Sequence, residues 1–248
     1  MKVDLLYLAH NRLNNTQITL PKLLHSTNYP YSLRIVDNGS TDGTETYLKT
    51  VLDNAPPKIK ITLVVNQNNK VLSKPTNEFW QDSNADLVGK IDNDILVEDG
   101  WLEKLVTAHH TVSKLAAIGG FHFPMEIFDY KKCKHNIYEY NDIQILRQPH
   151  IGGNYLAKRH ILLENGFLEE HSAADFKLGG WTGYQNRLTK KGYIIGYYYP
   201  LITFGHLHLA PSDYYKRVRK MSKRKYLRWE KKVGKEMIYT KWAWDYVI

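Results

Sequence analysis

Short apolar runs alternate with polar stretches over the first part of the chain. The apolar runs lie at Val3–Leu8, Tyr31–Val36, Ile59–Val65 and Leu87–Ile91, and runs of this kind bounded by turn residues predict strands. The polar stretches between them predict helices, the clearest of which spans Thr44–Leu52. Because strands that alternate with helices indicate βαβ units, we expect an α/β domain with a mostly parallel, Rossmann-like sheet.

The pattern is less regular in the second half of the chain. Helices are expected near residues 159–165 and over Trp181–Lys191, each followed by a glycine that can end it. Apolar runs between them predict a smaller mixed or antiparallel extension of the sheet. These runs are Ala116–Phe123, Ile143–Gln148, Ile151–Lys158, Tyr193–Tyr199 and Ile202–His208. We therefore expect one domain over residues 1–210, followed by an extension over residues 211–248.

Polar loops follow three of the predicted strands, at Ala9–Arg12, Asp37–Gly43 and Asp92–Asp94. The carboxyl ends of parallel strands meet at one edge of a sheet, where α/β proteins bind their ligands. Two carboxylates one residue apart at such an edge suit a divalent cation that carries a diphosphate. The alternative is a surface turn in which Asp92 and Asp94 are solvated or cap the next helix.

The composition describes a packed globular protein, since 43% of the residues are hydrophobic. A single cysteine, Cys133, excludes an internal disulfide and a cysteine-based zinc site, which fits a reducing compartment. No apolar run approaches the roughly 18–20 residues that span a bilayer, and no signal-peptide pattern follows Met1. We therefore expect a soluble, cytoplasmic protein.

Positive charge is concentrated near the end of the chain. Residues 214–235 contain eleven Lys or Arg and one acid, Glu230, so this segment accounts for the net charge of +9. Apolar residues recur through it at helical spacing, including Tyr226 and Trp229, which predicts a basic amphipathic helix. Such a helix can dock on the domain through its apolar face, and its lysines can still bind an anionic partner, which would be DNA, a charged glycan or a membrane surface.

Three ordered motifs in this chain resemble those of family-2 glycosyltransferases with the GT-A fold. They are Ala-His-Asn-Arg12, Val-Asp-Asn-Gly-Ser-Thr-Asp-Gly-Thr44 and Lys-Ile-Asp-Asn-Asp94. Looser similarity continues through Gly152-Gly153-Asn154, Gly166–Glu170 and Arg187…Gly192-Tyr193. The resemblance covers roughly residues 3–210 and implies a GT-A fold and a nucleotide-sugar donor.

The resemblance also assigns candidate site residues. Asp37 would accept the imino proton of a base, usually uracil. Asp92 would contact ribose or metal-bound water, and Asp94 would ligate Mn²⁺ or Mg²⁺ with a late histidine, His206 or His208. Lysines in the loop before the fourth strand would add positive charge near the diphosphate. The candidate nucleotide-binding residues are Ala9, Asn11, Arg12, Asp37, Lys70, Lys74, Asp92 and Asn93.

The chain departs from the family where the catalytic base is expected. Members commonly carry paired acids before the arginine that corresponds to Arg187, whereas Gly179–Asn186 contains no carboxylate. Inverting transfer needs a base for the acceptor hydroxyl, and Asp175 is the nearest acid upstream. Gly153, Trp181 and Tyr184 are candidates for acceptor contact, although aromatic residues beside glycines are equally consistent with a core.

The leading hypothesis is a metal-dependent glycosyltransferase that moves a sugar from a nucleotide sugar, such as a UDP-sugar, to a hydroxyl of a glycan or another polymer. A phage-type enzyme that glycosylates hydroxylated DNA bases is one alternative, because it would use the basic segment and would extrude the base into a pocket. A non-catalytic nucleic-acid-binding protein is the other. A nucleotidyltransferase is disfavoured, because the loop Ala9–Arg12 lacks glycines.

Overall fold

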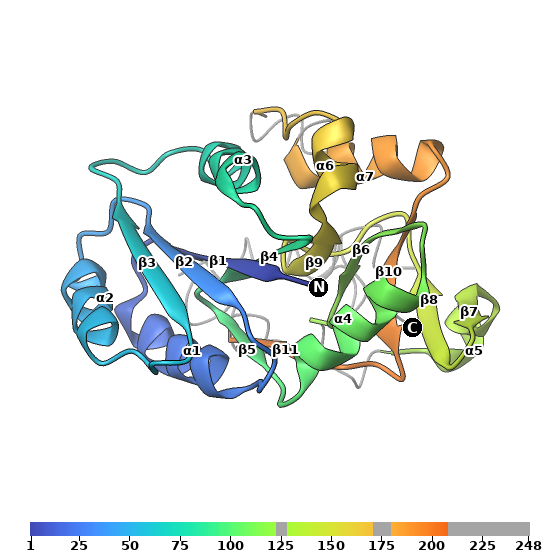
Figure 1. Cartoon of the computed structure of the whole chain (residues 1–248), viewed down its shortest axis with the longest axis horizontal. Helices are drawn as coiled ribbons and strands as arrows, with labels where there is room; N and C mark the ends of the chain where they lie inside the picture. Colours follow the sequence, from blue (N-terminus) through green and yellow to red (C-terminus); the bar gives the residue numbers. More distant parts are fainter. Residues whose placement is uncertain (123–127, 171–179, 208–248) are drawn as a thin grey trace, which may run out of the picture.

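The computed structural model describes residues 1–122, 128–170 and 180–207, and a nine-stranded mixed sheet runs through it (Figure 1). The strand order is β3-β2-β1-β4-β9-β6-β10-β8-β7. The strands are β1 (Val3–Ala9), β2 (Ser32–Asp37), β3 (Lys60–Val65), β4 (Leu87–Asp92), β6 (Leu115–Gly119), β7 (Ile137–Tyr140), β8 (Ile143–Arg147), β9 (Tyr155–Lys158) and β10 (Ile194–Tyr199).

The first four strands form the parallel half of this sheet, with β1 between β2 and β4 and with β3 at the edge. Strand β9 lies antiparallel between β4 and β6, β10 is parallel to β6, and β8 and β7 add an antiparallel hairpin. The predicted α/β class and the mixed extension are thus confirmed. The register pairs Ala9 with Asp37 and Leu8 with Asp92, so β1, β2 and β4 end side by side.

Helices cover both faces of the sheet (Figure 1). On one face lie α1 (Leu13–His25), α2 (Thr44–Asp53) and α4 (Trp101–Thr111), and on the other lie α3 (Ser73–Asp82), α6 (Arg159–Glu164) and α7 (Gly180–Lys190). Strand β1 serves both layers, because Leu5 and Tyr7 join the first core cluster while Leu6 and Leu8 join the second. Burial on both faces explains the uninterrupted apolar runs of the central strands.

Helices α1 and α3 each contain a proline. Helix α1 continues through Pro21, and α3 begins at Ser73 with Pro75 in its first turn, a position that proline tolerates. Other elements differ from those predicted. The expected strand from Ile151 shortens to β9, because Gly152 and Gly153 lie outside the ladder. The short helices α5 (Tyr130–Cys133) and η2 (Lys134–Asn136) and strand β7 were not predicted.

A separate two-stranded sheet carries one of the late histidines. Strands β5 (Ile95–Val97) and β11 (Phe204–His206) pair antiparallel, with His206 opposite Ile95. The backbone N–H of Leu207 donates to the Asp94 carbonyl at 2.8 Å. This pairing brings His206 to the carboxyl edge of the large sheet, beside Asp94.

Several predictions fall on residues that the structure does not describe. They are the extension over 211–248 with its basic segment, the candidate ligand His208 and the candidate base Asp175. No helix in residues 1–122, 128–170 and 180–207 has the length and apolar character needed to cross a membrane.

Candidate functional site

The three predicted polar loops meet at the carboxyl edge of β1, β2 and β4. The backbone N–H of Asn38 donates to the Ala9 carbonyl at 2.8 Å, and that of Asn93 donates to the Leu8 carbonyl at 3.2 Å. Ala9 itself is fully buried, so it contributes its backbone rather than its side chain. The prediction that this edge gathers the polar loops is confirmed.

Asn11 links all three loops. Its backbone N–H donates to Ser40 Oγ at 2.8 Å, and its side-chain oxygen accepts from the Thr41 N–H at 2.8 Å. Its carbonyl accepts from Asn93 Nδ2 at 2.8 Å. The backbone of Asn11 is left-handed, with φ of 53°, a conformation that asparagine tolerates better than most residues. Asn11 therefore shapes the site through contacts within the protein.

Asn93 also makes its contacts within the protein. Its side chain is buried, and Nδ2 donates to Thr16 Oγ1 at 3.0 Å as well as to the Asn11 carbonyl. Asn93 is predicted to contact the nucleotide, whereas its side-chain amide binds the Asn11 carbonyl and the Thr16 hydroxyl. The sequence does not reveal this role, because an asparagine between two aspartates could equally contact a nucleotide or hold the protein's own loops.

Asp37 is a fully buried carboxylate at the end of β2. Its Oδ1 accepts hydrogen bonds from the Ser40 backbone N–H at 3.1 Å and from the Ser40 hydroxyl. Its Oδ2 has no hydrogen-bond partner among the residues that the structure describes. An unsatisfied buried carboxylate oxygen is costly, so this atom is suited to accept an N–H from a bound ligand.

The loop that carries Lys70 is held by Asn38. The Asn38 side chain donates to Asn69 Oδ1 and to the Lys70 carbonyl, both at 2.8 Å, and accepts from Asn66 Nδ2 at 3.0 Å. Lys70 is half-buried beside this network, whereas Lys74 is exposed on α3. Of the two predicted lysines, only Lys70 is fixed by contacts to the loop that follows β2.

Asp92 and Asp94 each pair with a cation from this chain. Lys90 Nζ donates to Asp92 Oδ1, and Arg12 donates to Asp94 Oδ2. Asn154 contacts Asp92 twice, because its Oδ1 accepts from the Asp92 N–H at 2.7 Å and its Nδ2 lies 3.3 Å from Asp92 Oδ2. Lys90 and Asn154 are not among the predicted site residues. The position of Lys90 within an apolar strand could have identified it, because a buried lysine needs a partner.

His206 Nε2 lies 3.8 Å from Asp94 Oδ2. Burial lowers the pKa of His206, and the nearby carboxylates Asp94 and Asp92 oppose that shift. A largely neutral imidazole beside a buried carboxylate offers one nitrogen and one oxygen donor to a metal ion. The structure thus brings together the predicted ligands Asp94 and His206.

These two residues fit a metal that is shared with a substrate. In the part of the chain that the structure describes, no three His, Cys, Asp or Glu side chains could hold a metal ion by themselves. Mg²⁺ and its analogues are commonly held by one or two protein groups together with substrate phosphates. Asp94 and His206 match that incomplete set, and Arg12 now occupies the carboxylate oxygen nearest the histidine.

The predicted acceptor residues lie in different environments. Trp181 is partly exposed, donates from Nε1 to the Gly152 carbonyl at 2.9 Å and stacks on Tyr155 with ring centroids 4.0 Å apart. Tyr184 is fully buried, and its hydroxyl donates to the Leu162 carbonyl. Tyr184 therefore belongs to the core and presents no surface to an acceptor, which corrects that assignment.

The paired glycines also have distinct neighbours. A Cβ on Gly152 would lie 2.5 Å from His122 Cε1, so its backbone approaches His122 rather than a ligand. A Cβ on Gly153 would lie 3.6 Å from both Asp92 Oδ2 and Lys90 Nζ. Gly153 thus borders the acidic motif, whereas Gly152 allows close packing against His122.

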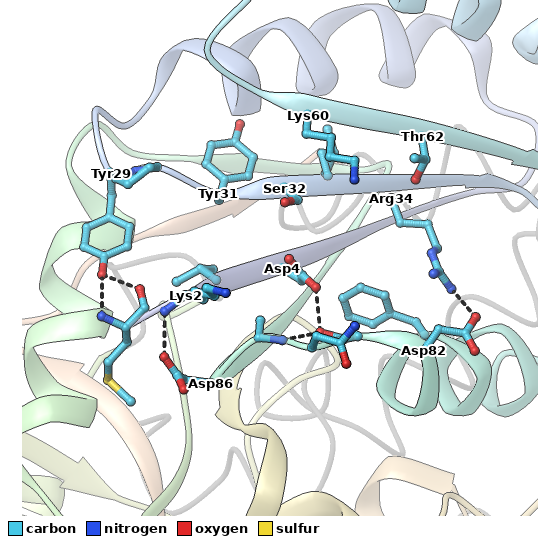
Figure 2. A pocket seen from close by; sticks show the side chains of 18 of the residues that line it. Lys2, Asp4, Tyr29, Tyr31, Ser32, Arg34, Lys60, Thr62, Asp82 and Asp86 are labelled. Carbon is cyan, nitrogen blue, oxygen red and sulfur yellow. Dashed lines mark hydrogen bonds and ion pairs between the residues drawn. The ribbon is translucent and has the colours of Figure 1, made fainter.

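A separate hollow of about 1020 Å³ lies at the opposite, amino end of the parallel strands (Figure 2). Several of its charged groups are engaged within the protein: Arg34 pairs with Asp82 at 2.9 Å, and Asp4 accepts from Ser83 at 2.6 Å. Figure 2 shows these pairs within the hollow, together with Asp86, which accepts from the Lys2 backbone N–H at 2.7 Å. The unsatisfied carboxylate and the histidine lie at the other edge of the sheet, where we place the functional site.

The fold is that of an α/β protein in which three polar loops meet at the carboxyl edge of a parallel sheet. The chain belongs to glycosyl transferase family 2, whose model matches residues 6–166. The family resemblance noted in the sequence is therefore confirmed. A search of curated proteins finds no significant match.

Solved structures with a similar fold include glycosyltransferases. The mannosyltransferase PcManGT from Pyrobaculum calidifontis, in complex with GDP-Man and Mn²⁺, is 17% identical with a TM-score of 0.68, over 87% of this chain and 59% of that one. GalNAc-T7 with UDP, GalNAc and Mn²⁺ is 14% identical with a TM-score of 0.62, over 83% and 44%. S. aureus TarS with UDP-GlcNAc is 15% identical with a TM-score of 0.57, over 87% and 64%. The chain thus spans less than two thirds of these neighbours.

Proposed function

We propose that the protein transfers a sugar from a nucleoside diphosphate sugar to a hydroxyl group of an acceptor. The observation that carries this proposal is the carboxyl-edge site, where the unsatisfied Asp37 oxygen and the Asp94–His206 pair flank the loop Asn11–Arg12. Structural neighbours bind GDP-Man and UDP-GlcNAc, and membership of glycosyl transferase family 2 supports the same reaction class.

In this proposal each residue has a chemical role. Asp37 Oδ2 accepts an N–H from the base, which both uracil and guanine can supply, and we favour uridine. Arg12 and Lys70 contribute positive charge near the diphosphate. Asp94 and His206 hold Mn²⁺ or Mg²⁺, and the bound metal neutralises the departing nucleoside diphosphate. Asp175 is proposed to take the proton of the acceptor hydroxyl.

The acceptor is proposed to be a polyanion, because residues 214–235 account for the net positive charge of the chain. A charged glycan and DNA with hydroxylated bases both fit this description, and a cytoplasmic location fits either. Changing Lys223, Arg224 and Lys225 to Gln in the full chain should weaken acceptor binding and reduce its dependence on salt. Unchanged salt dependence would remove the polyanion from the proposal.

The donor proposal is tested by a screen of UDP- and GDP-sugars for hydrolysis in the presence of Mn²⁺. We expect at least one sugar nucleotide to be cleaved, and we expect Asp94→Asn to reduce the rate by at least about a hundredfold. Asp99→Asn is the matched control, because Asp99 is exposed and pairs with Lys22 at 2.7 Å away from the site. Equal activity of wild type and Asp94→Asn would contradict the proposal.

A further inference from the structure

Lys90 is a buried cation in the middle of the large sheet. It lies on β4 between β1 and β9, opposite Leu6 and Tyr155, and only 6% of the residue is exposed. Its neighbours on the strand, Gly89 and Ile91, are buried as well. A buried ammonium is costly unless it is paired and hydrogen-bonded. The groups that Lys90 contacts therefore indicate its role.

The Lys90 ammonium points along the strand to the rim of the site. Residues two apart on a strand share a face, and Lys90 Nζ donates to Asp92 Oδ1 while lying 3.4 Å from the Gly153 carbonyl. Asn154 contacts the other carboxylate oxygen. Both Asp92 oxygens are thus fixed in direction by side chains that are themselves buried.

The two acids of the motif differ in how their charge is balanced. The Asp94 side chain is buried and its partner Arg12 is 47% exposed, so this cation can leave and be replaced. For Asp92 the arrangement is reversed, because the Lys90 side chain is 8% exposed and the Asp92 side chain is 32% exposed. Asp92 therefore keeps its own cation and presents a partly exposed carboxylate, which can accept further hydrogen bonds.

We propose that Lys90 is a positioning residue for the donor: it holds the Asp92 carboxylate toward the rim, where this group accepts hydrogen bonds from the ribose hydroxyls of the nucleotide. The inference rests on the proposed function, since it needs a nucleotide in the site. The ribose contact of Asp92 is the role that the family resemblance implies, and the inference adds the buried cation that holds this carboxylate in place.

The test compares UDP with 2′,3′-dideoxy-UDP by calorimetric titration in the presence of Mn²⁺, with the GDP pair as a second probe. Wild type should bind the ribose form about tenfold more tightly, as expected for hydrogen bonds to a charged group. In Lys90→Met, and in Asp92→Asn, the ratio should fall close to one. Lys90→Leu, which likewise removes both the donor and the charge, is a second variant with the same expected ratio should Lys90→Met fail to fold.

Lys158→Met is the matched control. Lys158 is also a buried lysine of the sheet, but its Nζ donates to the carbonyls of Val112 and Ser113, at 2.9 and 2.7 Å. Its loss should leave the ribose preference unchanged. A full ribose preference in the Lys90 variants, or none in wild type, would overturn the inference. Failure of wild type to bind any of these nucleotides would instead overturn the proposed function.

Discussion

Replacing Arg12 by Met should make the protein bind Mn²⁺ more tightly when no nucleotide is present. Arg12 pairs with Asp94 Oδ2, the same oxygen that lies 3.8 Å from His206 Nε2. A metal that binds to Asp94 and His206 must displace this guanidinium. Met keeps a long side chain at position 12, where the backbone φ is 65°, so the change removes the competing cation without changing the backbone requirement.

The size of the effect follows from the exposure of the pair. The Arg12 side chain is 47% exposed and the Asp94 side chain is 8% exposed, so the contact lies between a surface and a buried ion pair. Such a partly screened pair contributes about 1 kcal/mol, which corresponds to about a fivefold lower Kd for Mn²⁺ in the variant. The unpaired Asp94 should also destabilise the metal-free variant by about 1–3 kcal/mol.

Two assays measure these effects. Titration of free Mn²⁺ by electron paramagnetic resonance gives the Kd, and thermal unfolding with and without Mn²⁺ gives the stabilisation, which is about 2.7 kcal/mol at a hundredfold excess over Kd. Lys22→Met is the control, because it also removes a positive charge, but one that pairs with Asp99 instead of Asp94. Equal or weaker Mn²⁺ binding by Arg12→Met would refute competition at Asp94.

Three further predictions concern stability and the core. Burial lowers the pKa of His109 to about 3, so between pH 6.5 and about 3 the unfolded chain binds a proton that the folded chain does not. As the pH decreases across that window, the free energy of unfolding should therefore fall by about 1.4 kcal/mol per pH unit. Urea unfolding of His109→Gln should show a smaller dependence of this free energy on pH, and an equal dependence would contradict the prediction. Tyr184→Phe should lower stability by about 1 kcal/mol and leave the KM for acceptor unchanged, whereas a raised KM would restore the acceptor role. Gly39→Ala should destabilise by more than about 1 kcal/mol, because φ is 78° and a Cβ would lie 2.6 Å from the Asn68 backbone; unchanged thermal unfolding would contradict this.

The fold followed from features that are local in sequence. Continuous apolar runs marked β1, β2 and β4, and the turn residues after β2 marked the start of α2, where Asp42 Oδ1 accepts from the Thr44 N–H at 3.1 Å. Strand β7 was missed, because Ile137–Tyr140 is half-exposed or exposed and is stabilised by its pairing with β8. That pairing depends on tertiary contacts that a short, largely exposed segment does not reveal.

The site was predictable in position and less so in detail. Parallel strands bring their ends together, so Asp37, Asp92 and Asp94 could be placed at one edge from their order alone. Which polar side chains face a ligand and which hold the loops depends on hydrogen bonds between distant segments. Asn93 binds the carbonyl of Asn11, and no sequence pattern distinguishes such an amide from one that contacts a nucleotide.

The account depends most on a cation held between Asp94, His206 and the diphosphate of a donor. Anomalous diffraction from crystals soaked with Mn²⁺ and UDP, or Mn²⁺ and GDP, tests this directly. We predict a manganese peak within coordination distance of an Asp94 oxygen and His206 Nε2, with Arg12 turned away from Asp94. A bound nucleotide with no manganese at Asp94, and with Arg12 still paired to it, would contradict the account.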